Sequence, residues 1–218
     1  MAANGEAITP HSLEHAPPRR DFLQLVAAAG AAVGLGAIIW PLIDSMEPAA
    51  DTLSVGAPMD VDLSKMEAGQ QIIVLWRGKP ILLVNRPPAA LKMLQDASLV
   101  SRLSDPDSTA LQQPPYAQNW HRSLVPELVV LVGICTHLGC LPGYFPKPDA
   151  SDPAPGWPGG YFCPCHGSKY DLAGRVYKGV PAPYNLPVPP YLMVNDKTVR
   201  IGENPVGQTF DLNSVVQI

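Results

Sequence analysis

The amino-acid sequence predicts a mainly β protein, in which an antiparallel β head over residues 54–218 follows one membrane-spanning helix. The 218-residue chain contains 26 Pro and 18 Gly, more than a helical bundle tolerates, and this favours short strands joined by turns. Residues 22–43 form an apolar run without a charged residue. All four Cys lie between residues 135 and 165, so we expect them to serve one purpose in the head.

Charge and composition exclude two broad classes of protein. The net charge is −4 and the sequence pI is about 5.7, which argues against nucleic-acid binding because such domains present a basic face. Charged residues make up only 16% of the chain, against a usual share of about 25%, so a long disordered charged chain is excluded as well. The low charge indicates contact with a membrane or an unusually loop-rich head.

The apolar run 22–43 predicts a retained membrane anchor. A helix of this length spans roughly 33 Å at about 1.5 Å per residue, which is enough for a bilayer core of about 30 Å. A buried core helix is the alternative, for which so long an uncharged run is unusual. Arg19 and Arg20 precede the run and Asp44 follows it. By the positive-inside rule, residues 1–21 form a cytoplasmic tail and the head lies across the membrane.

The end of the tail resembles a twin-arginine export signal, an address for proteins that are exported folded. The run Arg19-Arg20-Asp21-Phe22-Leu23 carries this resemblance, although Pro18 and Gln24 depart from the residues that such signals prefer. A cleaved signal therefore remains an alternative to the retained anchor. The nearest small-residue site, Pro48-Ala49-Ala50, is a poor cleavage site.

Residues 44–53, DSMEPAADTL, indicate a linker between the anchor and the head, because they are small and polar with one Pro. Ten residues span about 33 Å when extended but only about 15 Å as a helix. The segment is therefore either a flexible hinge or a plain spacer, and the sequence alone favours the spacer.

The head is predicted to consist of short strands and few helices. Turn residues and apolar runs place two hairpins, one short helix, one long loop and one buried strand. In chain order these are a hairpin of Gln71–Trp76 and Pro80–Asn85 around Arg77-Gly78-Lys79, a helix within 87–97, an irregular loop over 99–126, a strand at Leu128–Val132, and a hairpin of Tyr191–Val194 and Thr198–Ile201.

Two short motifs hold every Cys and two of the five His. The first is Cys-Thr-His-Leu-Gly-Cys at 135–140, and the second is Cys-Pro-Cys-His-Gly-Ser at 163–168. Each follows a strand-like stretch, and its Gly or Pro predicts a tight loop. The other histidines, His11, His15 and His121, lie in polar or Pro-rich surroundings, and we interpret them as solvated residues.

The two motifs suit more than one chemistry. A zinc site would use four of the six Cys and His side chains in a tetrahedron. A 2Fe–2S centre can also use four, two Cys on one iron and two His on the other. The remaining two thiols would then form a disulfide in an oxidising compartment. Two structural disulfides with incidental His would not explain the close Cys–His spacing in both motifs. The spacing favours the iron–sulfur centre and leaves zinc open.

The paired motif resembles that of the Rieske iron–sulfur proteins of cytochrome bc-type complexes. The chain is similar to bacterial ubiquinol–cytochrome c reductase iron–sulfur subunits over nearly its whole length, in its anchor, linker, β head and order of motifs. The resemblance implies an antiparallel β-sandwich with a smaller cluster-binding β subdomain. The cluster-binding loops would be residues 133–145 and 161–185 within the domain 54–218.

The resemblance also implies a role for individual residues. The iron ligands would be Cys135, His137, Cys163 and His166. The disulfide would join Cys140 to Cys165.

Further residues would surround one Rieske-type 2Fe–2S cluster in such a protein. Ser168 and Tyr170 would donate hydrogen bonds to it, which stabilises the reduced form and favours a high potential. Leu138 and Pro181 would form its apolar rim, the latter within the Pro181-Ala182-Pro183 loop. His166 would be the catalytic residue that takes a proton from quinol.

The chain departs from the family pattern in two places. Val180 precedes Pro-Ala-Pro where the family usually has Gly. The stretch 141–162 between the two motifs is longer than in mitochondrial relatives and rich in Pro and Gly. Neither departure touches a predicted ligand.

The function implied is electron transfer from ubiquinol, bound in a cytochrome b subunit, to a c-type cytochrome subunit. The chain would be a single-pass subunit of a dimeric complex, surrounded by lipid in the bacterial inner membrane. Its head would lie in the periplasm, and it would not turn over alone. The alternatives are a Rieske subunit of an arsenite-oxidase-like enzyme or of a plastoquinol-oxidising complex, and a zinc-stabilised binding module.

Overall fold

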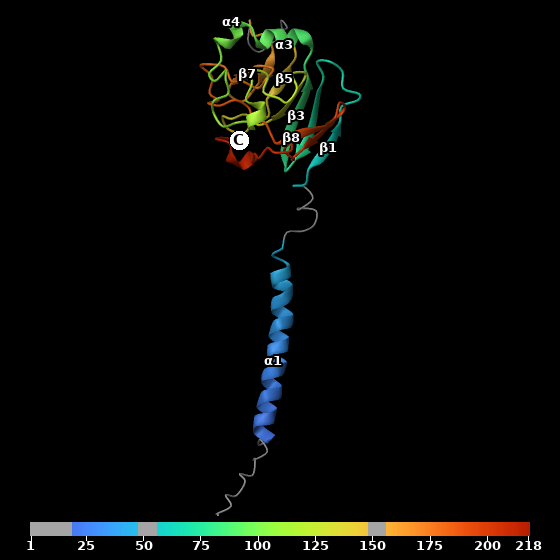
Figure 1. Ribbon diagram of the computed structural model, residues 1–218. Coiled ribbons are helices and arrows are strands. Elements are labelled where there is room, and N and C mark those ends of the chain that lie inside the picture. Colours follow the sequence, from blue (N-terminus) through green and yellow to red (C-terminus); the bar gives the residue numbers. More distant parts are fainter. Residues whose placement is uncertain (1–18, 48–55, 148–155) are drawn as a thin grey trace, which may run out of the picture. The chain divides into compact units, whose positions relative to one another are not determined.

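The computed structural model describes residues 19–47, 56–147 and 156–218 (Figure 1). The chain divides into two compact units, Met1–Ala50 and Asp51–Ile218, which are described separately. Most of the predicted tail, residues 48–53 of the predicted linker and the middle of the stretch 141–162 lie outside the described residues, and so do His11 and His15.

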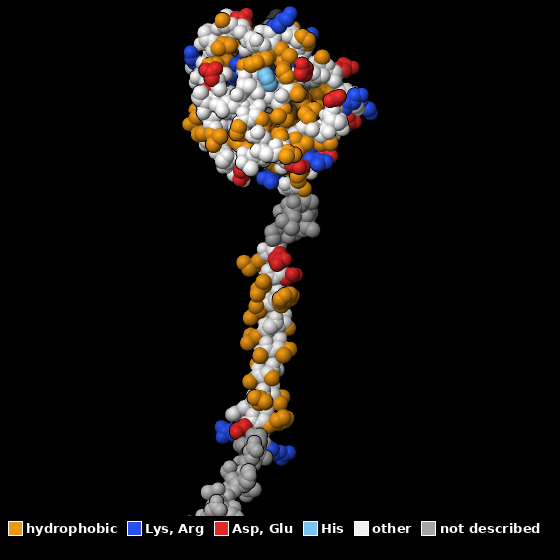
Figure 2. Space-filling view, in the orientation of Figure 1, with side chains coloured by type: hydrophobic (Ala, Val, Ile, Leu, Met, Phe, Trp, Pro, Cys, Tyr) orange, Lys and Arg blue, Asp and Glu red, His pale blue; other side chains and the backbone are white. Residues whose placement is uncertain are grey.

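The first unit contains the helix α1, Arg19–Asp44, which encloses the predicted span. Its most apolar 18-residue window has a mean hydropathy of 2.1, and none of the helix side chains is buried in the described protein. Figure 2 shows apolar side chains along its whole length, with basic residues where it begins and acidic residues where it ends. At about 1.5 Å per residue its 26 residues extend for about 39 Å, so the helix is long and apolar enough to cross a bilayer.

The first sheet of the head has the strand order β2-β3-β4 and is antiparallel throughout. The strands are β2 (Gln71–Trp76), β3 (Lys79–Asn85) and β4 (Leu128–Val132). The turn between β2 and β3 has a positive φ at both Arg77 (50°) and Gly78 (70°), as the tightest hairpin turns require. The predicted hairpin and the predicted buried strand are both confirmed.

The second sheet has the order β1-β9-β8 and shares one hydrophobic core with the first. Its strands are β1 (Met59–Asp62), β8 (Tyr191–Asn195) and β9 (Thr198–Ile201). Gly202, directly after β9, lies against the Trp76 ring, where a Cβ atom would approach ring atoms to 2.8 Å. The predicted hairpin of β8 and β9 is confirmed, and the two sheets together form the antiparallel sandwich.

The third sheet is smaller and carries the order β5-β6-β7. Its strands are β5 (Gly143–Phe145), β6 (Gly160–Phe162) and β7 (Lys169–Tyr170). Gly160 has a φ of 134° and lies directly against the Tyr170 carbonyl, so no side chain fits there. This close approach holds the short β6–β7 pair together.

The helices of the head are short and lie beside the third sheet (Figure 1). Two pack in a second apolar cluster with Trp157 and Leu172. The first confirms the helix predicted within 87–97, whereas the second, capped by the Asp96 side chain, was not predicted. Most of 99–126 is irregular, as predicted. The helices are α3 (Pro88–Leu94) and α4 (Ala97–Val100), with 3-10 turns at Pro115–Ala117 and Leu212–Ser214.

Candidate metal centre

The two Cys–His motifs fold into loops with the same hydrogen-bond pattern. In Cys135–Cys140 and in Cys163–Ser168, the N–H of the first residue donates to the carbonyl of the sixth, at 2.8 Å in both loops. The N–H of the fifth residue donates to the carbonyl of the first, at 3.0 and 2.9 Å. The fifth residue is Gly139 or Gly167, with a φ of 86° or 79°, a conformation that glycine adopts without strain.

Regular strands fix the position of both loops. β4 ends at Val132, three residues before Cys135. β6 ends at Phe162, directly before Cys163, and β7 begins at Lys169, directly after the second loop ends. The second loop is thus the turn of a β-hairpin, and the first follows a fully buried strand.

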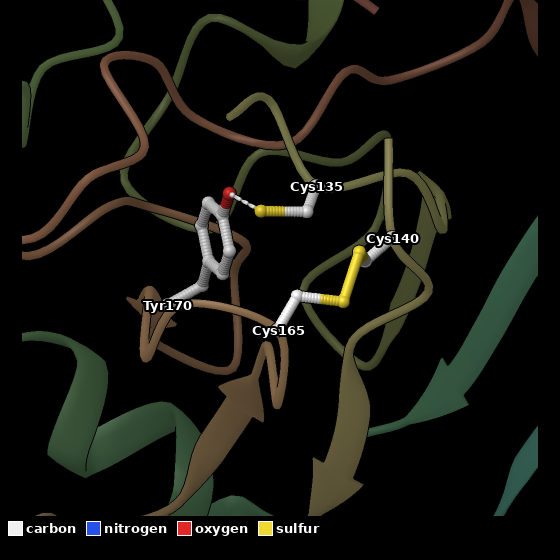
Figure 3. Close-up of a disulfide and its surroundings, with 4 residues drawn as sticks. All are labelled: Cys135, Cys140, Cys165 and Tyr170. Carbon is white, nitrogen blue, oxygen red and sulfur yellow. Dashed lines mark hydrogen bonds between the residues drawn. A yellow bond between two sulfur atoms is a disulfide. The ribbon is translucent and has the colours of Figure 1, made fainter. Parts of the chain in front are cut away.

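The tertiary structure brings the two loops together. A disulfide joins Cys140 to Cys165, as the family resemblance implies (Figure 3). The rings of His137 and His166 lie 4.6 Å apart between centroids and are perpendicular. Cys163 Sγ lies within 4.8 Å of both disulfide sulfurs, but those two are bonded to each other and leave only Cys163 of the three as a free thiol.

Burial separates the thiols from the imidazoles. Cys135 and Cys163 are free thiols, each 1% exposed, whereas His137 is half-buried and His166 is exposed. His137 Nδ1 is buried without a hydrogen-bond partner among the described residues. A buried ring nitrogen with no partner fits a metal ligand, because a metal would supply the missing interaction.

The Tyr170 hydroxyl lies at the first loop, 3.2 Å from Cys135 Sγ (Figure 3). It accepts a hydrogen bond from the Thr136 N–H at 3.2 Å, and Thr136 Oγ1 donates to the Tyr184 carbonyl at 2.7 Å. Burial and the adjacent Cys135 thiol raise the pKa of Tyr170, so its hydroxyl keeps its proton and remains a donor. Thr136 was missed by the sequence analysis, although its place between Cys135 and His137 marks it.

Ser168 connects the second loop to the Pro-rich segment. Its buried hydroxyl oxygen accepts the Ala182 N–H at 3.0 Å, which leaves the hydroxyl proton free for another acceptor. Pro181 is exposed beside Ala182, and Val180, where the family usually has Gly, is half-buried against both apolar clusters.

Backbone donors face the Cys163 sulfur. Burial raises the pKa of the Cys163 thiol, while the backbone N–H groups of Cys165 and His166 act in the opposite direction. The hydrogen bond with the Cys135 thiol also raises it. These N–H groups would stabilise the negative sulfur of a metal-bound thiolate.

The interpretation of His121 as a solvated residue was wrong. Its ring lies edge-on to Trp120 at 4.8 Å, and its Nδ1 is hydrogen-bonded to Ser123 Oγ at 2.8 Å. Burial and nearby Arg86 lower the pKa of His121 to about 4. His121 lies in the long loop and makes no contact with the two Cys–His loops among the hydrogen bonds and ring contacts of the described residues.

Comparison with known families assigns the class of the protein. The profile described as "Rieske [2Fe-2S] domain" matches residues 55–190. The profile described as "Ubiquitinol-cytochrome C reductase Fe-S subunit TAT signal" matches residues 9–49. The head is therefore a Rieske [2Fe–2S] domain that follows a twin-arginine signal and anchor helix.

Comparison with individual proteins narrows the class. The chain is 46% identical to the ubiquinol–cytochrome c reductase iron–sulfur subunit of Allochromatium vinosum over 186 residues, 85% of this chain and 89% of that one. It is 43% identical to the subunit of the same name from Bradyrhizobium diazoefficiens, over 89% of this chain and 99% of that one. A solved chain described as "Hyperthermophilic respiratory Complex III" has a TM-score of 0.47 and 27% identity, over 79% of this chain and 96% of that one.

The chain belongs to the family of ubiquinol–cytochrome c reductase Rieske iron–sulfur subunits. These are electron-transfer components of a membrane-anchored respiratory complex. The cofactor is accordingly a Rieske 2Fe–2S cluster and not the zinc ion that the spacing left open.

Proposed function

We propose that Cys135, His137, Cys163 and His166 hold the cluster, with the two thiolates on one iron and the two imidazoles on the other. The observation that carries this assignment is the meeting of the two Cys–His loops, which bear two buried free thiols and two adjacent His rings. The unpartnered Nδ1 of His137 supports its role as a ligand.

When bound, such a cluster exchanges one electron at a potential of about −150 to +300 mV. The chain's own donors act on the sulfur atoms that receive the added negative charge. The Tyr170 hydroxyl points at Cys135 Sγ, and the backbone N–H groups at 165 and 166 face Cys163 Sγ. Ser168 has a free hydroxyl proton in the same loop. All four donors favour the reduced state, so we propose a potential in the upper part of this range.

The exposed side of the site is suited to meet a quinol. His166 and Leu138 are exposed at the tips of the two loops, and Pro181 is exposed on the adjoining segment. We propose that the apolar side chains enter the quinol pocket of a cytochrome b subunit. The ring nitrogen of His166 that does not bind iron would accept the proton of the quinol hydroxyl.

The electron then leaves for a c-type cytochrome subunit of the same, dimeric complex. Arg19 and Arg20 at the start of α1 support a cytoplasmic N-terminus and a periplasmic head, with one span in the lipid of a bacterial inner membrane. The linker 44–53, proposed from its sequence as a hinge or spacer, would join the two parts.

Removing a hydroxyl donor is expected to lower the potential without loss of the cluster. Tyr170→Phe and Ser168→Ala each delete one hydrogen bond to a charged acceptor, which is worth roughly 1.5–3 kcal/mol. Because about 1.4 kcal/mol corresponds to about 59 mV for one electron, we expect drops of some tens to about 100 mV. An EPR-monitored redox titration measures the shift, and an unchanged potential in the double variant would contradict the assignment.

Docking is tested with two exposed aliphatic side chains. Leu138, 72% exposed, lies beside His137 in the first loop, whereas Val206 is fully exposed in the segment after β9. In the assembled complex, Leu138→Glu should slow quinol-dependent cytochrome c reduction at least tenfold, because a carboxylate resists transfer into an apolar pocket. Val206→Glu is the matched control and should retain the parent rate. Equal rates in both variants would refute docking through this tip.

A further inference from the structure

Three arginine side chains lie buried in the head, and only one of them has a carboxylate partner. Arg86, Arg122 and Arg175 are each at most 1% exposed. Arg175 Nε donates to Asp171 Oδ2 at 2.6 Å in a buried ion pair. In the described part of the chain, no acidic side chain lies at ion-pair distance from Arg86 or Arg122. Arg86, Arg122, Arg175 and Asp171 together are called the arginine cluster, and they carry three positive charges and one negative charge.

The arginine cluster surrounds the segment that follows Tyr170. Arg122 and Arg86 donate guanidinium hydrogen bonds to the carbonyl groups of residues 172–174, at 3.1 to 3.4 Å. This segment begins two residues after Tyr170, whose hydroxyl lies 3.2 Å from Cys135 Sγ. Two to four residues of extended chain span at most about 14 Å, and with the length of the Tyr170 side chain and the hydrogen bonds at either end this places both charges within roughly 25 Å of Cys135 Sγ.

The two unpaired arginines remain charged at neutral pH in spite of their burial. Burial lowers the pKa of Arg86 to about 10 and that of Arg122 to about 9, both above neutrality. Asp171, which is paired with Arg175, attracts both charges from a distance, and the half-buried Asp105 also attracts Arg122, although its carboxylate accepts the N–H groups of Thr109 and Ala110.

Keeping these charges is costly, because Arg122 Nε is also buried without a hydrogen-bond partner. Among the described residues, neither charge has a carboxylate at ion-pair distance, so each acts on other charges through the interior of the head.

We propose that the uncompensated charges of Arg86 and Arg122 raise the reduction potential of the metal centre by stabilising the negative charge that it gains on reduction. The inference rests on the proposed ligand assignment. A unit charge within roughly 25 Å at an effective dielectric constant near 20 changes an equilibrium constant by at least about threefold. The donors Tyr170 and Ser168 act at contact, whereas the arginines act through the low-dielectric interior, where salt screens weakly.

The test compares charge-removing with charge-keeping variants of the full chain in its complex. Arg122→Met should lower the equilibrium constant for one-electron reduction at least about threefold, a fall of at least about 28 mV in an EPR-monitored titration. Arg122→Lys keeps the charge and should shift the potential by less than half as much. Both shifts should be the same at low and high ionic strength. Arg200→Gln, which removes an exposed charge paired with Asp60 on the second sheet, is the control and should leave the potential unchanged.

An isosteric second variant avoids loss of the arginine. Gln113 is buried, and its Oε1 accepts a hydrogen bond from Arg122 Nη2 at 2.9 Å. Gln113→Glu places a compensating carboxylate there and should also lower the equilibrium constant, by about threefold or more. An unchanged potential in Gln113→Glu, or equal shifts in the Lys and Met variants of Arg122, would overturn the inference. An unchanged EPR line shape in these variants would show that the cluster and its ligands are intact, so that a change in potential comes from the altered charge.

Discussion

His166→Ala is expected to abolish the Rieske EPR signal of the reduced protein. The substitution removes one of the two histidines, His137 and His166, whose rings the tertiary structure brings together in the described part of the chain, and His166 lies in an exposed loop. A cluster needs all four ligands, so we expect loss of the cluster and of all quinol-dependent electron transfer in the complex. The measurements are EPR of the dithionite-reduced membranes and iron content of the purified complex.

The control for this experiment is His121→Ala. His121 is half-buried and hydrogen-bonded to Ser123. Removing its ring should therefore disturb local packing at least as much as removing the exposed ring of His166. The Rieske EPR signal of the His121→Ala protein should nevertheless persist. A normal signal in the His166→Ala protein, or its loss in both proteins, would refute the ligand assignment.

Replacing both disulfide partners, Cys140→Ser with Cys165→Ser, is expected to destabilise the head by about 3 kcal/mol, since the bond closes a loop over a sequence separation of 25 residues. The disulfide also links the two Cys–His loops covalently, so its loss should make the cluster labile. We expect the midpoint for loss of visible absorbance in guanidinium chloride to fall by about 1 M or less, given a slope of a few kcal/mol per M.

The matched comparison is the parent protein titrated under the same conditions, with the absorbance and the far-UV circular dichroism followed together. In the variant, the absorbance should be lost before the secondary structure, because the loops separate while the sheets persist. Coincident and unshifted transitions would show that the disulfide adds nothing to the site.

Local sequence signals predicted several elements correctly. The hairpin β2–β3 was predicted from the apolar runs on either side of Arg77 and Gly78. The residues of so tight a turn determine how the two strands pair. The anchor α1 follows from composition and length alone. The helix boundary at Asp96 was not predicted, because a single side-chain cap hydrogen bond decides between one helix and two. His121 was misjudged since its burial depends on Trp120 and on the core around Arg86.

By itself, the sequence determined the anchor, the strand pattern and the two Cys–His motifs, and the family resemblance implied the ligands and the disulfide partners. Such signals are local, because residue type and spacing within a few positions encode them. Only the tertiary structure decided how the two loops meet, that Tyr170 faces Cys135, and that Ser168 holds the Ala182 N–H. It also revealed the arginine cluster, whose members lie up to 89 positions apart (Arg86 to Arg175). These features depend on contacts between distant segments, and burial, which sets the energy of a charge or a thiol, exists only after the chain has folded.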